Sequence, residues 1–120
     1  MENRTPSKSF RDLIVWQKAH QLVLDIYKMT KSFPKEEIYG LTSQIRRSST
    51  SVAANIAEGF RKRSAADKAR IMNIGQGSLA ETEYYLILAQ DLLYSDTREL
   101  LNKEDKVGRI LDAYINSMKK

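Results

Sequence analysis

Two glutamates, Glu58 and Glu81, are the residues best placed to do chemistry, because each lies in a run of small side chains. Paired carboxylates can act as general acid and base or hold a metal ion. The alternative is structural, since a buried polar group needs a hydrogen-bond partner. In that interpretation, which we favour, these side chains form a polar network that fixes the register of helices or subunits. The network would comprise Gln44, Asn55, Glu58 and Glu81.

The single histidine, His20, gives little support to the hypothesis of a catalytic function. Ferritin-like di-iron bundles need Glu-x-x-His motifs, and the residue three before His20 is Gln17. A serine nucleophile would need a base nearby, and a chain without cysteine has no thiolate or zinc–sulfur site. No glycine-rich phosphate loop follows a strand. We therefore expect no catalysis, no metal and no cofactor, with His20 at the surface or at the boundary of the core.

Positive charge is concentrated in the first part of the chain. Residues 1–70 hold fourteen Lys or Arg and seven Asp or Glu, whereas residues 71–120 hold six and eight. Such an excess attracts polyanions, above all nucleic acid; the bland alternative is a solvated basic face. The residues that would bind nucleic acid are Arg46, Arg47, Arg61, Lys62, Arg63, Lys68 and Arg70.

The length and hydropathy of the chain limit the classes of protein to which it can belong. A chain of 120 residues suits one domain. Its longest apolar run, residues 84–89, is far shorter than a membrane span, and the first residues lack the apolar stretch of a signal peptide. We expect a cytoplasmic protein that does not bind membranes.

The spacing of apolar residues predicts four helices, over about residues 13–31, 41–62, 65–94 and 97–118. Pro34 ends the first, and Ser64 to Asp67 fit a capping box at the start of the third. No segment alternates as a strand would. The expected fold is all-α: an antiparallel up-and-down four-helix bundle over residues 10–120, preceded by an N-terminal extension over residues 1–9.

Small residues on the two middle helices predict close packing. Gly75 and Gly77 lie inside a predicted helix at a cost of up to about 1 kcal/mol each, which close approach of another backbone would explain. The chain also has more aromatic residues than one narrow core readily takes. We expect at least Tyr39 and Tyr84 between subunits or at a rim, the alternative being the core and edge of a single bundle.

Four stretches in this order resemble the four-helix-bundle family of 23S ribosomal RNA intervening-sequence proteins. They are Phe10–Ala19 (FRDLIVWQKA), Phe33–Arg47 (FPKEEIYGLTSQIRR), Ala54–Gly59 (ANIAEG) and Gly77–Glu83 (GSLAETE). The resemblance implies a small helical bundle that assembles as a ring-like homopentamer and has no established catalytic residues. The end of the chain is also similar to a related branch, the accessory proteins of diversity-generating retroelements, which bind nucleic acid and a reverse transcriptase.

The basic residues and the small-residue faces thus favour a non-catalytic homo-oligomer that binds structured RNA through phosphates, and the resemblance implies an association with 23S rRNA. No aromatic RNA-recognition strand and no GXXG loop is present, so recognition would follow backbone and shape. The alternative is an oligomeric adaptor for a protein such as a reverse transcriptase or a ribonucleoprotein. A catalytic use of Glu58 and Glu81 is the weakest of the three hypotheses.

Overall fold

The computed structural model describes residues 7–119, and over these residues it contains helices and no strand. The four long helices are α1 (Ile14–Thr30), α2 (Leu41–Arg61), α3 (Ala65–Asp91) and α4 (Arg98–Met118), with short 3-10 turns η1 (Phe10–Asp12) and η2 (Lys35–Glu37). The expectation of an all-α fold with four helices is confirmed. Of the predicted N-terminal extension, residues 1–6 lie outside the described residues, as does residue 120 at the other terminus.

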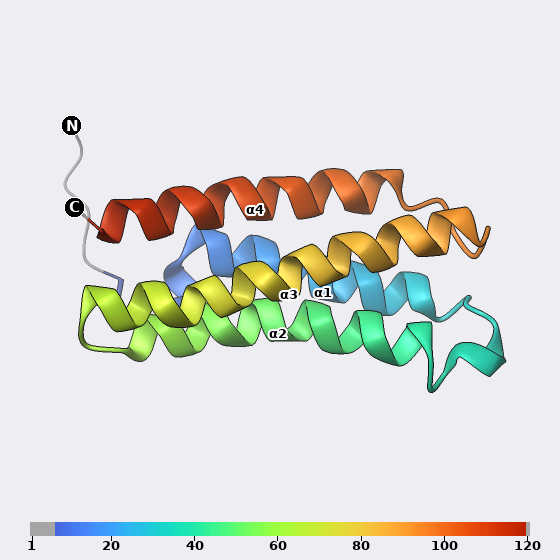
Figure 1. Cartoon of the computed structure of the whole chain (residues 1–120), viewed down its shortest axis with the longest axis horizontal. Coiled ribbons are helices and arrows are strands. Elements are labelled where there is room, and N and C mark those ends of the chain that lie inside the picture. Colours follow the sequence, from blue (N-terminus) through green and yellow to red (C-terminus); the bar gives the residue numbers. More distant parts are fainter. Residues whose placement is uncertain (1–6, 120) are drawn as a thin grey trace.

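The four helices lie alongside one another in a body of 48 × 27 × 20 Å (Figure 1). The turn between α2 and α3 is at one end, and the connections before α2 and after α3 are at the other (Figure 1). The core runs between the helices, and every helix contributes to it. Its largest fully buried side chains are Leu22, Ile26, Ile45, Ile56, Met72, Leu86 and Leu111.

Helices α2 and α3 approach closely where glycine replaces a side chain. A Cβ at Gly59 would lie 2.7 Å from Met72 Cγ, and one at Gly75 would lie 3.4 Å from Asn55 Cβ. Close packing therefore requires the glycine at position 59, whereas at position 75, where the sequence predicted such a requirement, a Cβ would make only ordinary van der Waals contact. Close packing does not explain Gly77, because a Cβ there would meet nothing within 4 Å.

Helix α3 ends at Asp91, three residues before its predicted end. Leu93 takes a left-handed conformation with φ 62°, and the Tyr94 amide donates to the carbonyl of Ala89 at 2.9 Å. This is the hydrogen-bonding pattern of a Schellman motif, which satisfies the last carbonyls of a helix. Leu92 and Leu93 continue the apolar spacing that predicted a longer helix, but both side chains are exposed.

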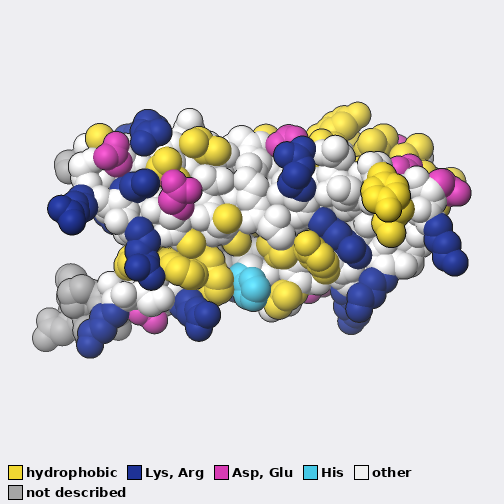
Figure 2. Space-filling model, turned by 90° about the horizontal axis from the view of Figure 1, so that it is seen from below, with side chains coloured by type: hydrophobic (Ala, Val, Ile, Leu, Met, Phe, Trp, Pro, Cys, Tyr) yellow, Lys and Arg dark blue, Asp and Glu magenta, His cyan; other side chains and the backbone are white. Residues whose placement is uncertain are grey.

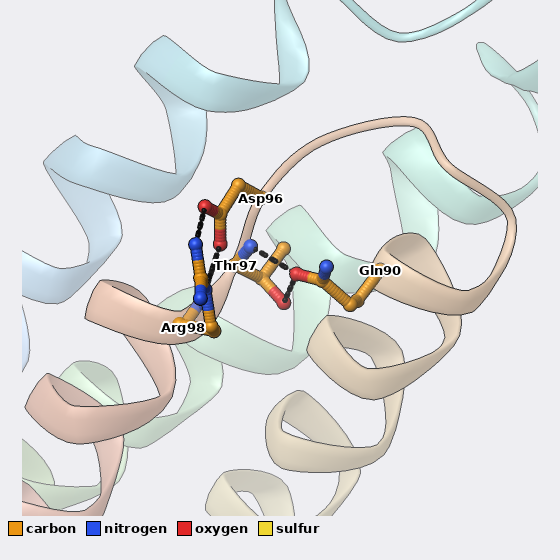
Figure 3. Close-up of polar contacts among 4 residues, drawn as sticks. All are labelled: Gln90, Asp96, Thr97 and Arg98. Carbon is orange, nitrogen blue, oxygen red and sulfur yellow. Dashed lines mark hydrogen bonds and ion pairs between the residues drawn. The ribbon is translucent and has the colours of Figure 1, made fainter.

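The start of α4 is fixed by polar contacts that Figure 3 displays. Thr97 is fully buried; its amide donates to Gln90 Oε1 at 2.7 Å and its hydroxyl to the Leu86 carbonyl at 2.8 Å. Beside it, Arg98 forms a two-pronged ion pair with Asp96, at 3.0 Å and 2.7 Å. That guanidinium holds the pKa of Asp96 at about 2. The turn therefore directs α4 back along α3.

Candidate nucleic-acid interface

Five of the predicted cations lie together where α2 turns into α3, and we call this group the basic end. It comprises Arg61, Lys62, Arg63, Lys68 and Arg70. The turn is short because α2 stops at Arg61 and α3 begins at Ala65, with the Ser64 hydroxyl accepting from the Asp67 amide at 3.1 Å. Dark blue side chains gather at this end of the molecule (Figure 2, left).

The carboxylates near the basic end only partly offset its charge. Lys62 pairs with Glu58 at 3.7 Å and Arg70 with Asp67 at 3.8 Å, all with exposed or half-exposed side chains. Exposed pairs of this kind contribute little and rearrange readily. Arg61 and Arg63 are exposed and form no ion pair within 4 Å among residues 7–119. Most of this charge therefore faces solvent.

Lys68 has a second role. Its ammonium donates to the Phe60 carbonyl at 2.5 Å and lies 5.2 Å from the centre of the Phe60 ring. A cation at the C-terminal end of a helix interacts favourably with the helix dipole and with its unpaired carbonyls. The contact ties the first turns of α3 to the last turn of α2.

The other predicted cations, Arg46 and Arg47, lie apart from the basic end. Fourteen residues of helix, about 21 Å, separate Arg47 from Arg61. Arg46 is half-buried against α1: its Nε donates to Thr30 Oγ1 at 2.8 Å, and its guanidinium lies 4.6 Å from the centre of the Tyr27 ring. Arg47 is exposed and donates to Gln44 at 2.8 Å. The seven cations therefore do not form one patch.

The four residues of the predicted polar network do not come together either. Glu58 and Glu81 are exposed; Glu58 pairs with Lys62, and Glu81 accepts from the Tyr85 hydroxyl at 3.3 Å. Gln44 contacts Arg47. Glutamates flanked by small residues face solvent here because the small residues themselves occupy the helix contact.

Asn55 does lie at the contact between α2 and α3, next to hydroxyl groups that the sequence analysis passed over. Its amide nitrogen donates to Ser51, at 2.8 Å to the carbonyl and 3.0 Å to the hydroxyl. The Ser51 hydroxyl bonds that of Ser78 at 2.8 Å, and Ser48 bonds Thr82 at the same distance. The spacing of these residues, three or four apart on facing helices, was the available signal.

A different carboxyl group is chemically unusual. Glu104 on α4 is buried, and burial, followed by the charges of Glu83 and Asp105, raises its pKa to about 7. Glu104 takes no part in the contacts of Glu58 or Glu81 described above.

Among residues 7–119, no three His, Asp or Glu side chains are arranged to hold a metal ion. Within the same residues, none of the helices has the length and hydrophobicity to cross a bilayer.

Comparison with known proteins identifies the family. A family model described as 23S rRNA-intervening sequence protein matches residues 11–113. The chain is also similar to the crystal structure of a protein of unknown function from the S23 ribosomal protein family of Bacteroides thetaiotaomicron. The two share 29% identity over 85% of this chain and 98% of the other, with a TM-score of 0.74. No curated protein matches the chain. With a match over most of its length, on the four helices that the apolar spacing predicted, the chain belongs to the family of 23S rRNA-intervening sequence proteins.

Proposed function

We propose that this protein is a non-catalytic, oligomeric bundle that binds structured RNA in the cytoplasm, with 23S rRNA as the expected target. The observation that supports it is the basic end, where five cations fall within ten residues and Asp67 is the only acid among them. Arginine offers planar, two-pronged hydrogen bonds to phosphate. Contacts of this kind with phosphates would position the protein on the RNA without reading particular bases.

The oligomer is the second part of the proposal. We propose that antiparallel up-and-down bundles assemble as a ring-like homopentamer, as the family resemblance implies. The exposure of large side chains supports an assembly: Tyr39 is 93% exposed, Tyr84 57% and Ile74 51%. Aromatic residues are enriched where subunits meet. A ring would repeat the basic end five times and so strengthen a modest attraction in each subunit.

Filter binding of 23S rRNA fragments at two salt concentrations tests the proposal. Affinity should fall steeply with salt, because each neutralised phosphate releases counterions. The double variant R61Q/R63Q should reduce the slope of log affinity against log salt by about 2. Its control, R98Q/R109Q, removes the same charge from arginines that are paired with Asp96 and Asp105 and should change the slope less. An affinity that does not change with salt concentration, or an absence of binding at low salt, would contradict the proposal.

A second candidate function is an adaptor for another protein. It is favoured by four exposed apolar side chains at the end opposite the basic end: Ile38, Tyr39, Leu92 and Leu93. The two segments are joined there, since the Tyr94 hydroxyl donates to Glu37 at 2.7 Å. Purification with a reverse transcriptase after nuclease treatment separates the candidates, because a protein complex should survive the loss of RNA. Leu93→Ser should then weaken that complex and leave RNA binding unchanged.

A further inference from the structure

Three aromatic side chains form a continuous stack where the chain enters α1. The Phe10 ring lies edge-on to Trp16, with centroids 5.1 Å apart and planes at 63°. Trp16 is in turn parallel to His20, at 4.9 Å and 10°. Phe10 and Trp16 are half-buried and pack on the core, whereas His20 is exposed. The stack is therefore anchored at one end and presents an imidazole ring to solvent at the other.

The stack lies beside a row of small residues on α2 that has an arginine at each end. Arg46, Thr50, Ala53, Ala57 and Arg61 follow one another at spacings of four and three, so they share one face of the helix. The contacts of Arg46 with Tyr27 and Thr30 turn that face toward α1. At the other end of the row, η1 lies against α2.

We call these two rows, Trp16, His20 and Tyr27 on α1 and the row Arg46 to Arg61 on α2, the aromatic face. His20 and Tyr27 are two helical turns apart on one side of α1, about 10.5 Å. The two arginines are fifteen residues apart, about 22 Å. In Figure 2 the cyan histidine lies within a line of yellow side chains, with dark blue side chains toward both ends of the line.

Resting on the proposed function, we propose that the aromatic face binds unpaired nucleotides of the RNA. A base stacks on the exposed ring of His20, and the flanking phosphates are contacted by Arg46 and Arg61. Stacking on a side-chain ring is available to every base, and with cations alongside it is the usual chemistry of single-strand binding. Arg46 keeps donors for this role, because a guanidinium has five and only two are engaged.

The charge of this face favours a nucleic acid over a second copy of the chain. The two rows carry two arginines and no acid. Of the acids beside them, Glu58 is paired with Lys62 and Asp12 accepts from the amides of Lys8 and Ser9, so the charge of the face suits a polyanion. A perfect duplex is excluded as the ligand of this face, because its bases are stacked on one another and cannot reach His20. The distance between the arginines accommodates about six stacked nucleotides at 3.4 Å each.

Trp16 provides a direct readout, since it is the only tryptophan in the chain. The full-length protein is titrated at low salt with a twelve-residue oligouridylate and, separately, with a blunt RNA hairpin of equal charge, while tryptophan fluorescence and affinity are recorded. We expect the single strand to change the fluorescence and to bind more tightly than the hairpin. His20→Ala should weaken single-strand binding by about fivefold to a hundredfold and leave hairpin binding unchanged.

Two variants separate stacking from other effects. His20→Phe keeps a ring but no ionisable group, so it should retain the affinity for the single strand. Gln21→Ala changes the neighbouring exposed residue and should have no effect; thermal melting verifies that all variants fold. If both RNAs bind equally, with unchanged fluorescence and no effect of His20→Ala, the aromatic face is not a binding site, although RNA binding by the basic end stands. If neither RNA binds at low salt, the proposed function fails as well.

Discussion

Helix α3 meets α2 and α4 through two very different sets of polar groups. Toward α2 it presents hydroxyls that pair with hydroxyls, Ser78 with Ser51 and Thr82 with Ser48. On its α4 side lies Glu104, an acid whose pKa is raised first by burial and then by the charge of Glu83. A hydroxyl both donates and accepts, so the first contact is satisfied at any ordinary pH. Two acids repel each other once both are ionised, so the second contact depends on pH.

The largest effect that tests this difference is expected from Glu104→Gln. Folding raises the pKa of Glu104 from 4.5 to about 7, so the folded chain holds that proton more tightly than the unfolded chain. The contribution of Glu104 to the stability of the native protein is therefore greatest below pH 4.5, and it is lost as the pH rises to about 7. The variant does not titrate there, and relative to the native protein it should gain about 2–3 kcal/mol between pH 4 and pH 8.

Urea unfolding at pH 4, 6 and 8 measures this change. Glu83→Gln is the informative companion, because it removes one acidic neighbour but leaves the carboxyl group buried. It should reproduce only part of the effect, since burial is the larger cause of the raised pKa. A difference between native protein and Glu104→Gln that is equal at all three pH values would mean that Glu104 titrates normally.

The next effect concerns the closeness of α2 and α3. Gly59→Ala should lower the free energy of unfolding by about 1–3 kcal/mol, because its Cβ would overlap the buried side chain of Met72. Gly77→Ala is the matched control in open space on α3. It should raise the free energy of unfolding by up to about 1 kcal/mol through helix propensity alone. Effects of the same sign would show that the contact at Gly59 is loose.

The smallest effect is expected from a single hydroxyl of the α2–α3 contact. Thr82→Val keeps the shape but removes the bonds from Thr82 to Ser48 and to the Ser78 carbonyl. We expect a loss of about 1 kcal/mol, equal at pH 4 and pH 8, measured by the same unfolding experiment. A loss that depended on pH would remove the distinction between the two contacts of α3.

The helices were predictable because each buries one stripe of apolar residues, and these residues recur every three to four positions in the sequence. The end of α3 was not, since Leu92 and Leu93 keep the spacing while the backbone turns away. The exposure of Glu58 and Glu81 could not be predicted from the sequence either. Small neighbours signal a close helix contact but not which side of the helix faces it.

The candidate site also has a part that the sequence predicts and a part that it does not. The basic end was predictable because its cations are adjacent in sequence, so any fold of that corner keeps them together. Arg46 was placed in the same set by its charge alone. Its position against Tyr27 depends on the packing of α1 on α2, which no local pattern encodes. The stack of Trp16 on His20 joins residues four apart on one helix, and that spacing was a signal that the sequence analysis left unused.

The ammonium of Lys68 has a consequence for how the protein meets an anion. Because it already serves as the counter-charge for the carbonyl end of α2, it is held inward and is less free to follow a ligand. The neighbouring guanidiniums would then account for most of the ions displaced on binding. Replacing Lys68 would first disturb the packing of α3 against the end of α2 and only secondarily reduce the positive charge of the basic end. A loss of RNA binding in such a variant would therefore report on the conformation of the turn between α2 and α3, not on its charge.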